Sequence, residues 1–447
     1  MIFKNIFRRG SALLLSAVLL MSFALTLSVL PLCSSAKTFE DIPTDNAEAI
    51  YIYNIENDLI LYQKNEGERI QPVSTVKIMV GLIATEALSG KLDEPVTITP
   101  QMIDGVVGQH YNIVAGHTLS VRDLLYLAFC GGCHRSINIL AHVISGNVPN
   151  FISLMNAKAA ELGMTDTLYT NVTGMHADGM YTTVNDIAKL CLEASKNPLL
   201  MQITTVDAHE TEMLGEKNFI FENRNYLVGT GYTAKYFNKL CHGLAAGSTT
   251  ESGYCVATIA DDGNLSYLCI VMGATEDTEN GIVYSYSLAN DLIKWAYSDW
   301  GYVEVISNTM PVCEIPVSMS LDIDSVLVVP SKTVSIYLPK SSAVGNGITH
   351  SYSLNSEELQ APVSEGAHVG IITAYYEGQE LVTVDLITKT SVAQSEVLYS
   401  LMRIREISQS RIFIASVIFA IIFIILYIIV KAFVRGYANN NRYRRLK

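Results

Sequence analysis

The sequence predicts a mixed α/β domain, then a small all-β domain, then one transmembrane helix near the C-terminus. Residues 47–300 mix short β-like runs with helical patterns. Residues 305–395 show β-branched alternation, broken by Ser, Gly and Asn turns and with little helical period. Residues 412–430 carry no charge, and at ~1.5 Å per residue they would span ~28 Å, close to the ~30 Å hydrocarbon layer of a bilayer.

The composition of the 447-residue chain agrees with this division. Hydrophobic residues make up 49% and charged residues only 16%, which indicates a membrane segment besides a packed core and excludes wholesale disorder. The formal net charge is −13, and the two ends hold nine positive charges and no acid, so residues 37–430 carry −22. Because a body this acidic repels phosphate backbones, nucleic acid is not an expected partner.

The N-terminal segment has the pattern of a signal peptide. Three cations precede an apolar stretch from Ala12 to Leu32, and the small residues at 34–36 offer a cleavage site. We therefore expect residues 1–36 to be removed. An uncleaved anchor is one alternative, and a lipoprotein attached through Cys33 is another that the bulky Leu32 disfavours.

The C-terminal segment predicts a single-pass anchor. Six cations and no acid follow the apolar run, and the positive-inside rule then places the short tail in the cytoplasm and the domains outside the cell membrane. The predicted divisions after the signal peptide are an α/β domain at 37–300, a β-rich domain at 305–395, a stalk at 396–411, a transmembrane helix at 412–430 and a basic tail at 431–447.

Several individual elements can be expected within the two domains. The run from Ser74 to Leu88 is apolar on nearly every face and is ended by Gly90, so it predicts a buried helix. Strand patterns bounded by turn residues occur at Ala49–Ile55, Leu59–Gln63, Tyr254–Ala260, Tyr267–Met272, Val326–Val329, Val334–Leu338, Val369–Tyr376 and Leu381–Leu386.

The start of the buried helix carries a candidate nucleophile. Ser74 and Lys77 are three residues apart and so share one helix face. An otherwise apolar helix offers Lys77 no solvated face, and loss of hydration lowers a lysine pKa toward a value useful for a general base. The simpler alternative is a capping serine followed by a surface lysine.

At these residues the sequence resembles the serine D-alanyl-D-alanine carboxypeptidases, the low-molecular-mass penicillin-binding proteins. The resemblance spans nearly the whole predicted exterior. It is carried by the segments Leu61–Leu88, Leu119–Tyr126, Glu161–His176, Thr182–Leu190, Gly253–Ala274 and Ala361–Asp385.

The resemblance implies a fold and a chemistry. The fold would be the β-lactamase and DD-peptidase type, an antiparallel sheet with flanking helices and a helical subdomain. Ser74 would be acylated by a peptidoglycan stem peptide with release of the terminal D-Ala, Lys77 would be the base, and β-lactams would form an adduct at the same serine. The family chemistry implies no metal or organic cofactor.

The second motif of the family, Ser-x-Asn, is lost. An ungapped alignment of Leu124–Asn138 places Gly132, Cys133 and His134 at its three positions, so the hydroxyl that relays a proton is absent. The run Ser136-Ile137-Asn138 spells the motif four residues late. We interpret that match as coincidence, because its use would need a shift of about one helical turn.

The third motif, Lys-Thr-Gly, is also lost. Its positions hold Ala245, Ala246 and Gly247, so the cation for the substrate carboxylate is absent. The strand itself is retained, and the resemblance implies that the N–H groups of Ser248 and Ser74 could still form an oxyanion hole. Arg135 or Lys239 is a possible replacement cation.

Cysteines beside these motifs suggest two further hypotheses. Residues 130–134 spell Cys-x-x-Cys-His, the pattern of c-type haem attachment, but the peptidase resemblance already accounts for this run. The family fold would bring Cys133 and His134 toward Cys241 and His242, which could form a zinc site or a disulfide. The favoured alternative is buried thiols and ordinary imidazoles.

Two functions from different classes are therefore open. One is a weak serine-type carboxypeptidase acting on peptidoglycan stem peptides. The other is a non-catalytic pseudoenzyme that serves as a cell-wall scaffold or a peptidoglycan-binding module.

Overall fold

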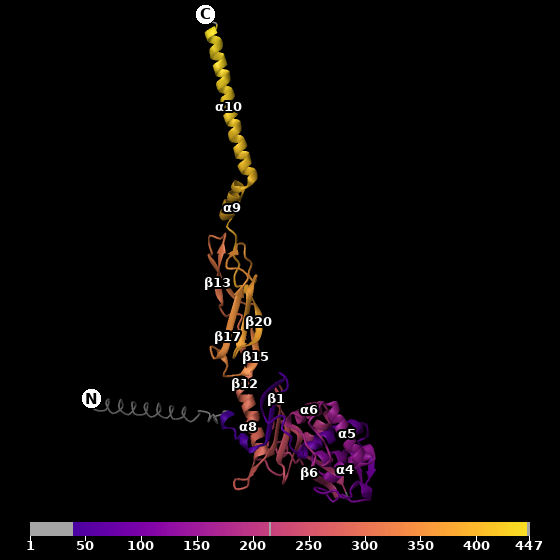
Figure 1. The fold of residues 1–447 in the computed structure, drawn as a ribbon. Helices are drawn as coiled ribbons and strands as arrows, with labels where there is room; N and C mark the ends of the chain where they lie inside the picture. Colours follow the sequence, from indigo (N-terminus) through magenta and orange to yellow (C-terminus); the bar gives the residue numbers. More distant parts are fainter. Residues whose placement is uncertain (1–38, 214–215, 445–447) are drawn as a thin grey trace, which may run out of the picture. The chain divides into compact units, whose positions relative to one another are not determined.

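The computed structural model describes residues 39–213 and 216–444, and the chain divides into two compact units between Trp300 and Gly301 (Figure 1). The predicted signal peptide and Cys33 lie outside the described residues.

The first unit contains a five-stranded antiparallel sheet in the order β2-β1-β9-β8-β7. Its strands are β1 Ala49–Asn54, β2 Leu59–Lys64, β7 Cys241–Thr249, β8 Gly253–Asp261 and β9 Ser266–Ala274. The central strands are buried on both faces. On β9, Leu268 and Ile270 belong to the core around the predicted buried helix, whereas Tyr267 donates a hydrogen bond to Ala296 of the last helix of this unit.

Helices cover this sheet and form a separate subdomain beside it. They are α2 Val76–Leu88, α3 Val121–Phe129, α4 His134–Ser145, α5 Val148–Glu161, α6 Val184–Ala194, α7 Pro198–Thr205 and α8 Tyr284–Asp299. α8 packs against β8 and β9, and α6 packs against β1 and β9. Side-chain caps begin α3, α5, α6 and α7, where Ser120, Asn147, Thr183 and Asn197 each accept a backbone N–H.

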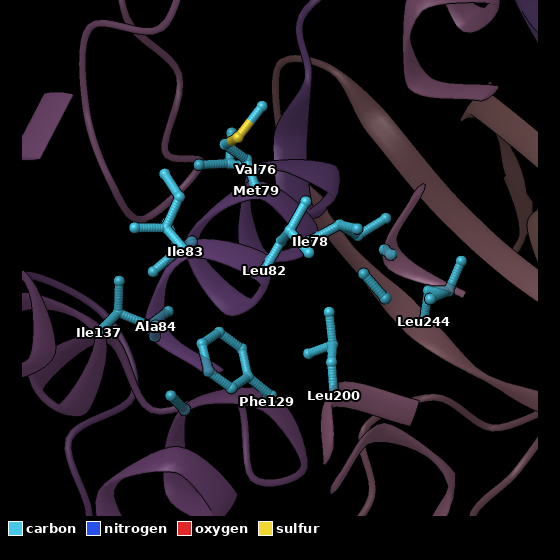
Figure 2. Close-up of a cluster of buried hydrophobic side chains, with 14 of the residues drawn as sticks. Val76, Ile78, Met79, Leu82, Ile83, Ala84, Phe129, Ile137, Leu200 and Leu244 are labelled. Carbon is cyan, nitrogen blue, oxygen red and sulfur yellow. The ribbon is translucent and has the colours of Figure 1, made fainter. Parts of the chain in front are cut away.

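Helix α2 is the centre of the subdomain core. Its residues are buried on nearly every face, as its apolar sequence predicts, and it contacts α3, α4, α5, α6 and α7. Figure 2 shows Ile78, Leu82 and Ala84 of this helix surrounded by Phe129 from α3, Ile137 from α4, Leu200 from α7 and Leu244 from β7.

Short elements complete the unit: β3 Pro95–Thr97, β4 Thr118–Ser120, β5 Ala208–Met213, β6 Glu216–Glu222, β10 Glu276–Asp277, β11 Ile282–Val283, and the 3₁₀ turns η1 Phe39–Asp41, η2 Thr44–Asn46, η3 Val73–Thr75, η4 Ser89–Lys91 and η5 Pro100–Met102.

The second unit begins with an all-β domain. Seven strands pair in the order β16-β17-β19-β20-β14-β13-β18, and β12 pairs with β15. Ile315, Val328, Ile372 and Leu386 lie in its core. The bounds are β12 Trp300–Ile306, β13 Cys313–Ser318, β14 Ser325–Pro330, β15 Val334–Pro339, β16 Ala343–Val344, β17 Gly347–Leu354, β18 Leu359–Gln360, β19 His368–Tyr376 and β20 Gln379–Thr388. The predicted class, an α/β domain followed by a β-rich domain, is confirmed.

Two helices come after the β-rich domain. α9, Glu396–Gln409, occupies the segment predicted as a stalk, and Ser395 caps its N-terminus. α10 runs over Arg411–Arg444. Two described helical segments are long and apolar enough to cross a membrane, Val73–Lys91 and Arg411–Arg435. The first is largely buried as a core helix, so the second is the candidate span.

Candidate active site

Ser74 lies at the entrance of α2, in the 3₁₀ turn η3. The serine is 7% exposed, and strands β7 and β8 both pack against its turn. The preceding residue, Val73, has φ +48°, a left-handed conformation that a β-branched residue rarely adopts. The tertiary contacts around the serine therefore hold a local backbone strain of order 1–3 kcal/mol.

Two glycines lie against the Ser74 turn. A Cβ added to Gly247 of β7 would lie 2.1 Å from Ser74 Oγ, and a Cβ added to Gly174 would lie 2.0 Å from the carbonyl oxygen of Val73. Glycine is the residue that permits these approaches. The backbone of Gly247 and Ser248, where the sequence predicts an oxyanion hole, is thus brought beside the serine hydroxyl.

Lys77 is part-buried one helical turn after Ser74. Loss of hydration lowers the pKa of Lys77 below its ordinary value, and the nearby positive charge of Arg224 lowers that pKa further. Cys255 acts in the opposite direction with a larger effect than Arg224, and Cys133 raises the pKa of Lys77 by less than either. A lowered pKa brings the amine closer to the neutral form that a general base needs.

A cavity of ≈10 Å³ lies beside Lys77. A space of this size holds about one water molecule. Its walls include both positions at which the sequence predicts a lost polar side chain, Gly132 and Ala245, together with Arg224. A Cβ added to Gly132 would lie 3.7 Å from Lys77 Nζ. Gly132, at which the sequence predicts loss of the second motif, therefore faces the lysine.

His134 begins α4 and lies within electrostatic range of Lys77. Its Nδ1 lies 2.9 Å from the carbonyl oxygen of Val107, and a Cβ added to Gly108 would lie 2.2 Å from the same nitrogen. Because a carbonyl only accepts, Nδ1 carries the proton and Nε2 is an acceptor. Burial, and then the charge of Lys77, lower the pKa of His134 to about 4, so the imidazole is neutral at pH 7.

The late copy of the second motif lies away from this cavity. Ser136 Oγ is buried and has no hydrogen-bond partner among the described atoms, and Asn138 Nδ2 donates to the carbonyl of Met102 at 2.8 Å. Neither side chain lines the cavity beside Lys77. Its position agrees with the interpretation of Ser136-Ile137-Asn138 as coincidence.

The proposed cysteine and histidine cluster does not assemble in the described part of the chain. Cys133 caps α4 by accepting from the N–H of Ser136 at 3.4 Å, while the Cys241 thiol is hydrogen-bonded to Thr258. The described cysteines are all free thiols, and no three His, Cys, Asp or Glu side chains in residues 39–213 and 216–444 gather closely enough to hold a metal. Cys133, His134, Cys241 and His242 therefore form neither the zinc site nor the disulfide considered from the sequence.

The two proposed replacement cations are also placed elsewhere. The guanidinium of Arg135 donates to the carbonyl of Ile113, and Lys239 lies in another hollow, with Lys235 and Lys294. The cation that does line the cavity is Arg224, which the sequence analysis missed. The available signal was an arginine between two asparagines, Asn223 and Asn225, in the loop before β7.

Profiles of two known protein families match the chain. The profile of the D-alanyl-D-alanine carboxypeptidase family matches residues 36–276, more than half of the chain. The chain belongs to this family. A second profile, that of the C-terminal domain of penicillin-binding protein 5, matches residues 303–394. The resemblance stated from the sequence is confirmed.

Curated relatives and solved structures cover most of the chain. The D-alanyl-D-alanine carboxypeptidase DacF of Bacillus subtilis is 26% identical over 332 residues, 73% of this chain and 81% of the relative. DacC of Escherichia coli is 24% identical over 383 residues, 81% of this chain and 88% of the relative. The structure of DacD from Francisella tularensis has a TM-score of 0.55 at 20% identity, over 78% of this chain and 94% of that one. The structure of penicillin-binding protein 5 from Haemophilus influenzae has a TM-score of 0.53 at 21% identity, over 78% of this chain and 98% of that one.

The contact between Gly174 and the Ser74 turn gives a first prediction. Gly174→Ala should lower the melting temperature and disturb the position of Ser74, because its new methyl group meets backbone atoms that cannot move aside. The matched control is Gly179→Ala. The two glycines have φ +78° and +75°, but nothing lies within 4 Å of a Cβ at Gly179. Thermal unfolding should show a larger loss of melting temperature in Gly174→Ala than in Gly179→Ala. Equal losses in the two variants would contradict the prediction.

Proposed function

We propose that this chain is a membrane-tethered serine D,D-peptidase that acts outside the cell on peptidoglycan stem peptides ending in D-Ala-D-Ala. The observation that carries the proposal is Ser74 Oγ packed against Gly247, one turn from a lysine whose pKa is lowered. Membership of the D-alanyl-D-alanine carboxypeptidase family supports the substrate class. The apolar part of α10 supports a C-terminal anchor with the basic tail inside, and residues 1–36 are proposed as the signal peptide.

The proposed reaction proceeds through an ester. Ser74 Oγ attacks the carbonyl carbon of the penultimate D-Ala, and Lys77 takes the hydroxyl proton. The C–N bond to the terminal D-Ala then breaks, and the leaving amine takes the proton that Lys77 accepted. Water hydrolyses the ester and restores Ser74. The N–H groups of Ser74 and Ser248 would stabilise the oxyanion formed in both steps.

Turnover is expected to be slow because two polar groups are missing. A positioned proton-transfer group contributes about 10²–10⁴ in rate, and Gly132 supplies none. A charge-assisted hydrogen bond contributes roughly 1.5–3 kcal/mol, and Ala245 supplies none. These same losses favour the second candidate, a pseudoenzyme that binds peptidoglycan without cleaving it.

Labelling with a fluorescent penicillin separates the two candidates. The full-length protein should form a covalent adduct, detected by gel fluorescence, and Ser74→Ala should abolish it. The matched control is Ser136→Ala, which removes the hydroxyl of the late motif copy and should leave labelling unchanged. Absence of an adduct at saturating probe would favour the pseudoenzyme.

The lowered pKa of Lys77 predicts the pH dependence of this reaction. The neutral amine is the base, so the first-order acylation rate at saturating penicillin should rise with pH through a midpoint below the ordinary lysine pKa of about 10.5. Arg224→Gln removes a like charge and should move the midpoint to higher pH, whereas Lys239→Gln should not. A rising limb at or above the ordinary value would contradict this assignment.

Gly132 is the position at which activity should be recoverable. In Gly132→Ser the new Cβ lies 3.3 Å from Arg224 Cγ, so the flexible arginine side chain must shift slightly, and 3.7 Å from Lys77 Nζ, so a hydroxyl there can exchange a proton with the amine. We expect acylation to accelerate by about 10²-fold. The left-handed backbone, φ +71°, should cost about 1–2 kcal/mol of stability.

Gly146→Ser is the matched control for this gain. Gly146 has φ +81° and nothing within 4 Å of an added Cβ, so its variant carries the same backbone cost without reaching the site. Stopped-flow acylation measures the effect, and an acceleration shared by both variants would contradict the role of the new hydroxyl.

A further inference from the structure

A groove of ≈1080 Å³ lies in the first unit between α8 and the loop before β7. A space of this size accommodates an organic ligand or a short stretch of a polymer. We call it the α8 groove. Its lining includes three lysines, a phenylalanine and two asparagines: Lys235, Lys239, Lys294, Phe237, Asn238 and Asn290.

The α8 groove gathers positive charge in an acidic protein. Residues 37–430 carry −22, yet the three groove lysines are exposed, and neither Lys239 nor Lys294 forms an ion pair with a carboxylate in the described part of the chain. Asp262 and Asp291 also line the groove. The carboxylate of Asp262 accepts two backbone N–H groups of its own turn, both at 2.9 Å, so its charge is engaged there. The groove therefore favours a ligand that carries negative charge.

Phe237 gives the same groove an apolar surface. Its side chain is 46% exposed, which leaves a large part of the ring in contact with water. A ligand with an apolar face would remove this area from water and gain free energy by doing so. Sugar rings have such a face, formed by their C–H groups.

Hydrogen bonds hold the walls of the α8 groove together. Asn238 Nδ2 donates to Asn290 Oδ1 at 2.8 Å, and Asn290 Nδ2 donates to the carbonyl of Tyr236 at 2.8 Å. Lys235 Nζ donates to the carbonyl of Gly281 at 2.9 Å. The loop and the helix are therefore fixed relative to each other, and the groove is formed before a ligand arrives.

The α8 groove lies near the start of β7, whereas Ser74 lies beside the later part of this strand. Leu240 lines the groove and Gly247 lies against Ser74, so the two ends are at most ~23 Å apart along an extended strand. A stem peptide has four residues before the bond that is cleaved, and it spans at most ~14 Å. The sugars that carry a bound stem peptide are therefore the part of the substrate that can approach the groove.

We propose, resting on the function proposed above, that the α8 groove binds a neighbouring disaccharide-peptide repeat of the peptidoglycan strand whose stem peptide is engaged at Ser74. The apolar face of a sugar ring would cover Phe237, and the carboxylates of the neighbouring stem peptide would meet the groove lysines. A repeat of the strand supplies both the sugar ring and the negative charge. Because two linked sites bind one polymer, the protein then prefers strands over isolated repeats.

Equilibrium binding to a non-acylating protein tests this site. The full-length Ser74→Ala protein in detergent is titrated with a tetrasaccharide that carries two pentapeptide stems and with the single-repeat disaccharide pentapeptide. The tetrasaccharide should bind about 10-fold more tightly, beyond the roughly twofold gain that a second stem gives by statistics. Phe237→Ala and Lys294→Gln should each reduce this gain, and the double variant should leave only the statistical part.

The matched controls remove the same groups outside the α8 groove. Lys91→Gln removes an exposed ammonium group and Tyr352→Ala removes an exposed aromatic ring, and both should preserve the gain. If thermal unfolding shows that Phe237→Ala does not fold, Phe237→Leu takes its place and should also reduce the gain. A gain that survives in the double variant overturns the site. Tighter binding of poly(glycerol phosphate) than of the tetrasaccharide overturns the choice of a glycan strand.

The outcomes also separate this proposal from the catalytic one. Normal penicillin labelling of Ser74 in the unmodified protein, without a gain for the tetrasaccharide, overturns the groove and leaves the peptidase function standing. A gain that depends on Phe237 and Lys294, without penicillin labelling, overturns the peptidase function and supports strand binding by a pseudoenzyme.

Discussion

The burial of helix α2 is the constraint on which the site depends. The helix is apolar on nearly every face, so it is stable only when it is surrounded by other elements, and five helices contact it. Its first turns carry Ser74 and Lys77 into the interior with it. The lysine loses hydration for the same reason that the helix is stable, and this loss is the main cause of its lowered pKa. The packing of the helix in the core and the lowered pKa of this lysine thus have one origin.

Small side chains line part of the cavity beside this helix. Glycine and alanine at positions 132 and 245 leave a water-sized cavity instead of a hydrogen-bond network. His134 is turned to the carbonyl of Val107 and remains neutral, so it adds no charge beside Lys77. Arg224 is then the dominant cation at the cavity. Its positive charge is one of the causes that lower the pKa of Lys77.

Agreement between sequence and structure is strongest where a pattern is long and local. The hairpin at 49–63 and the strands near 254–272 appear as β1, β2, β8 and β9 with small shifts at their ends. The hairpin β5–β6 and the pair β3–β4 were not foreseen, because their strands are short or polar and their pairing is decided by tertiary contacts. The less favoured hypothesis of a zinc site or disulfide between Cys133 and Cys241 was wrong, because both cysteines are free thiols and the described residues contain no cluster that could hold a metal.

The sequence by itself determined the α/β and all-β division and the buried helix with its serine and lysine, and it predicts the positions where two motifs depart from the family pattern. Each of these features is predicted by a pattern of neighbouring residues, through its periodicity, charge or spacing. Tertiary structure alone decided that Arg224, rather than Arg135 or Lys239, lines the cavity beside Lys77, and that burial keeps His134 neutral. Charges and hydrogen bonds act over a few ångströms of space, and the folded chain, not its local pattern, sets those distances.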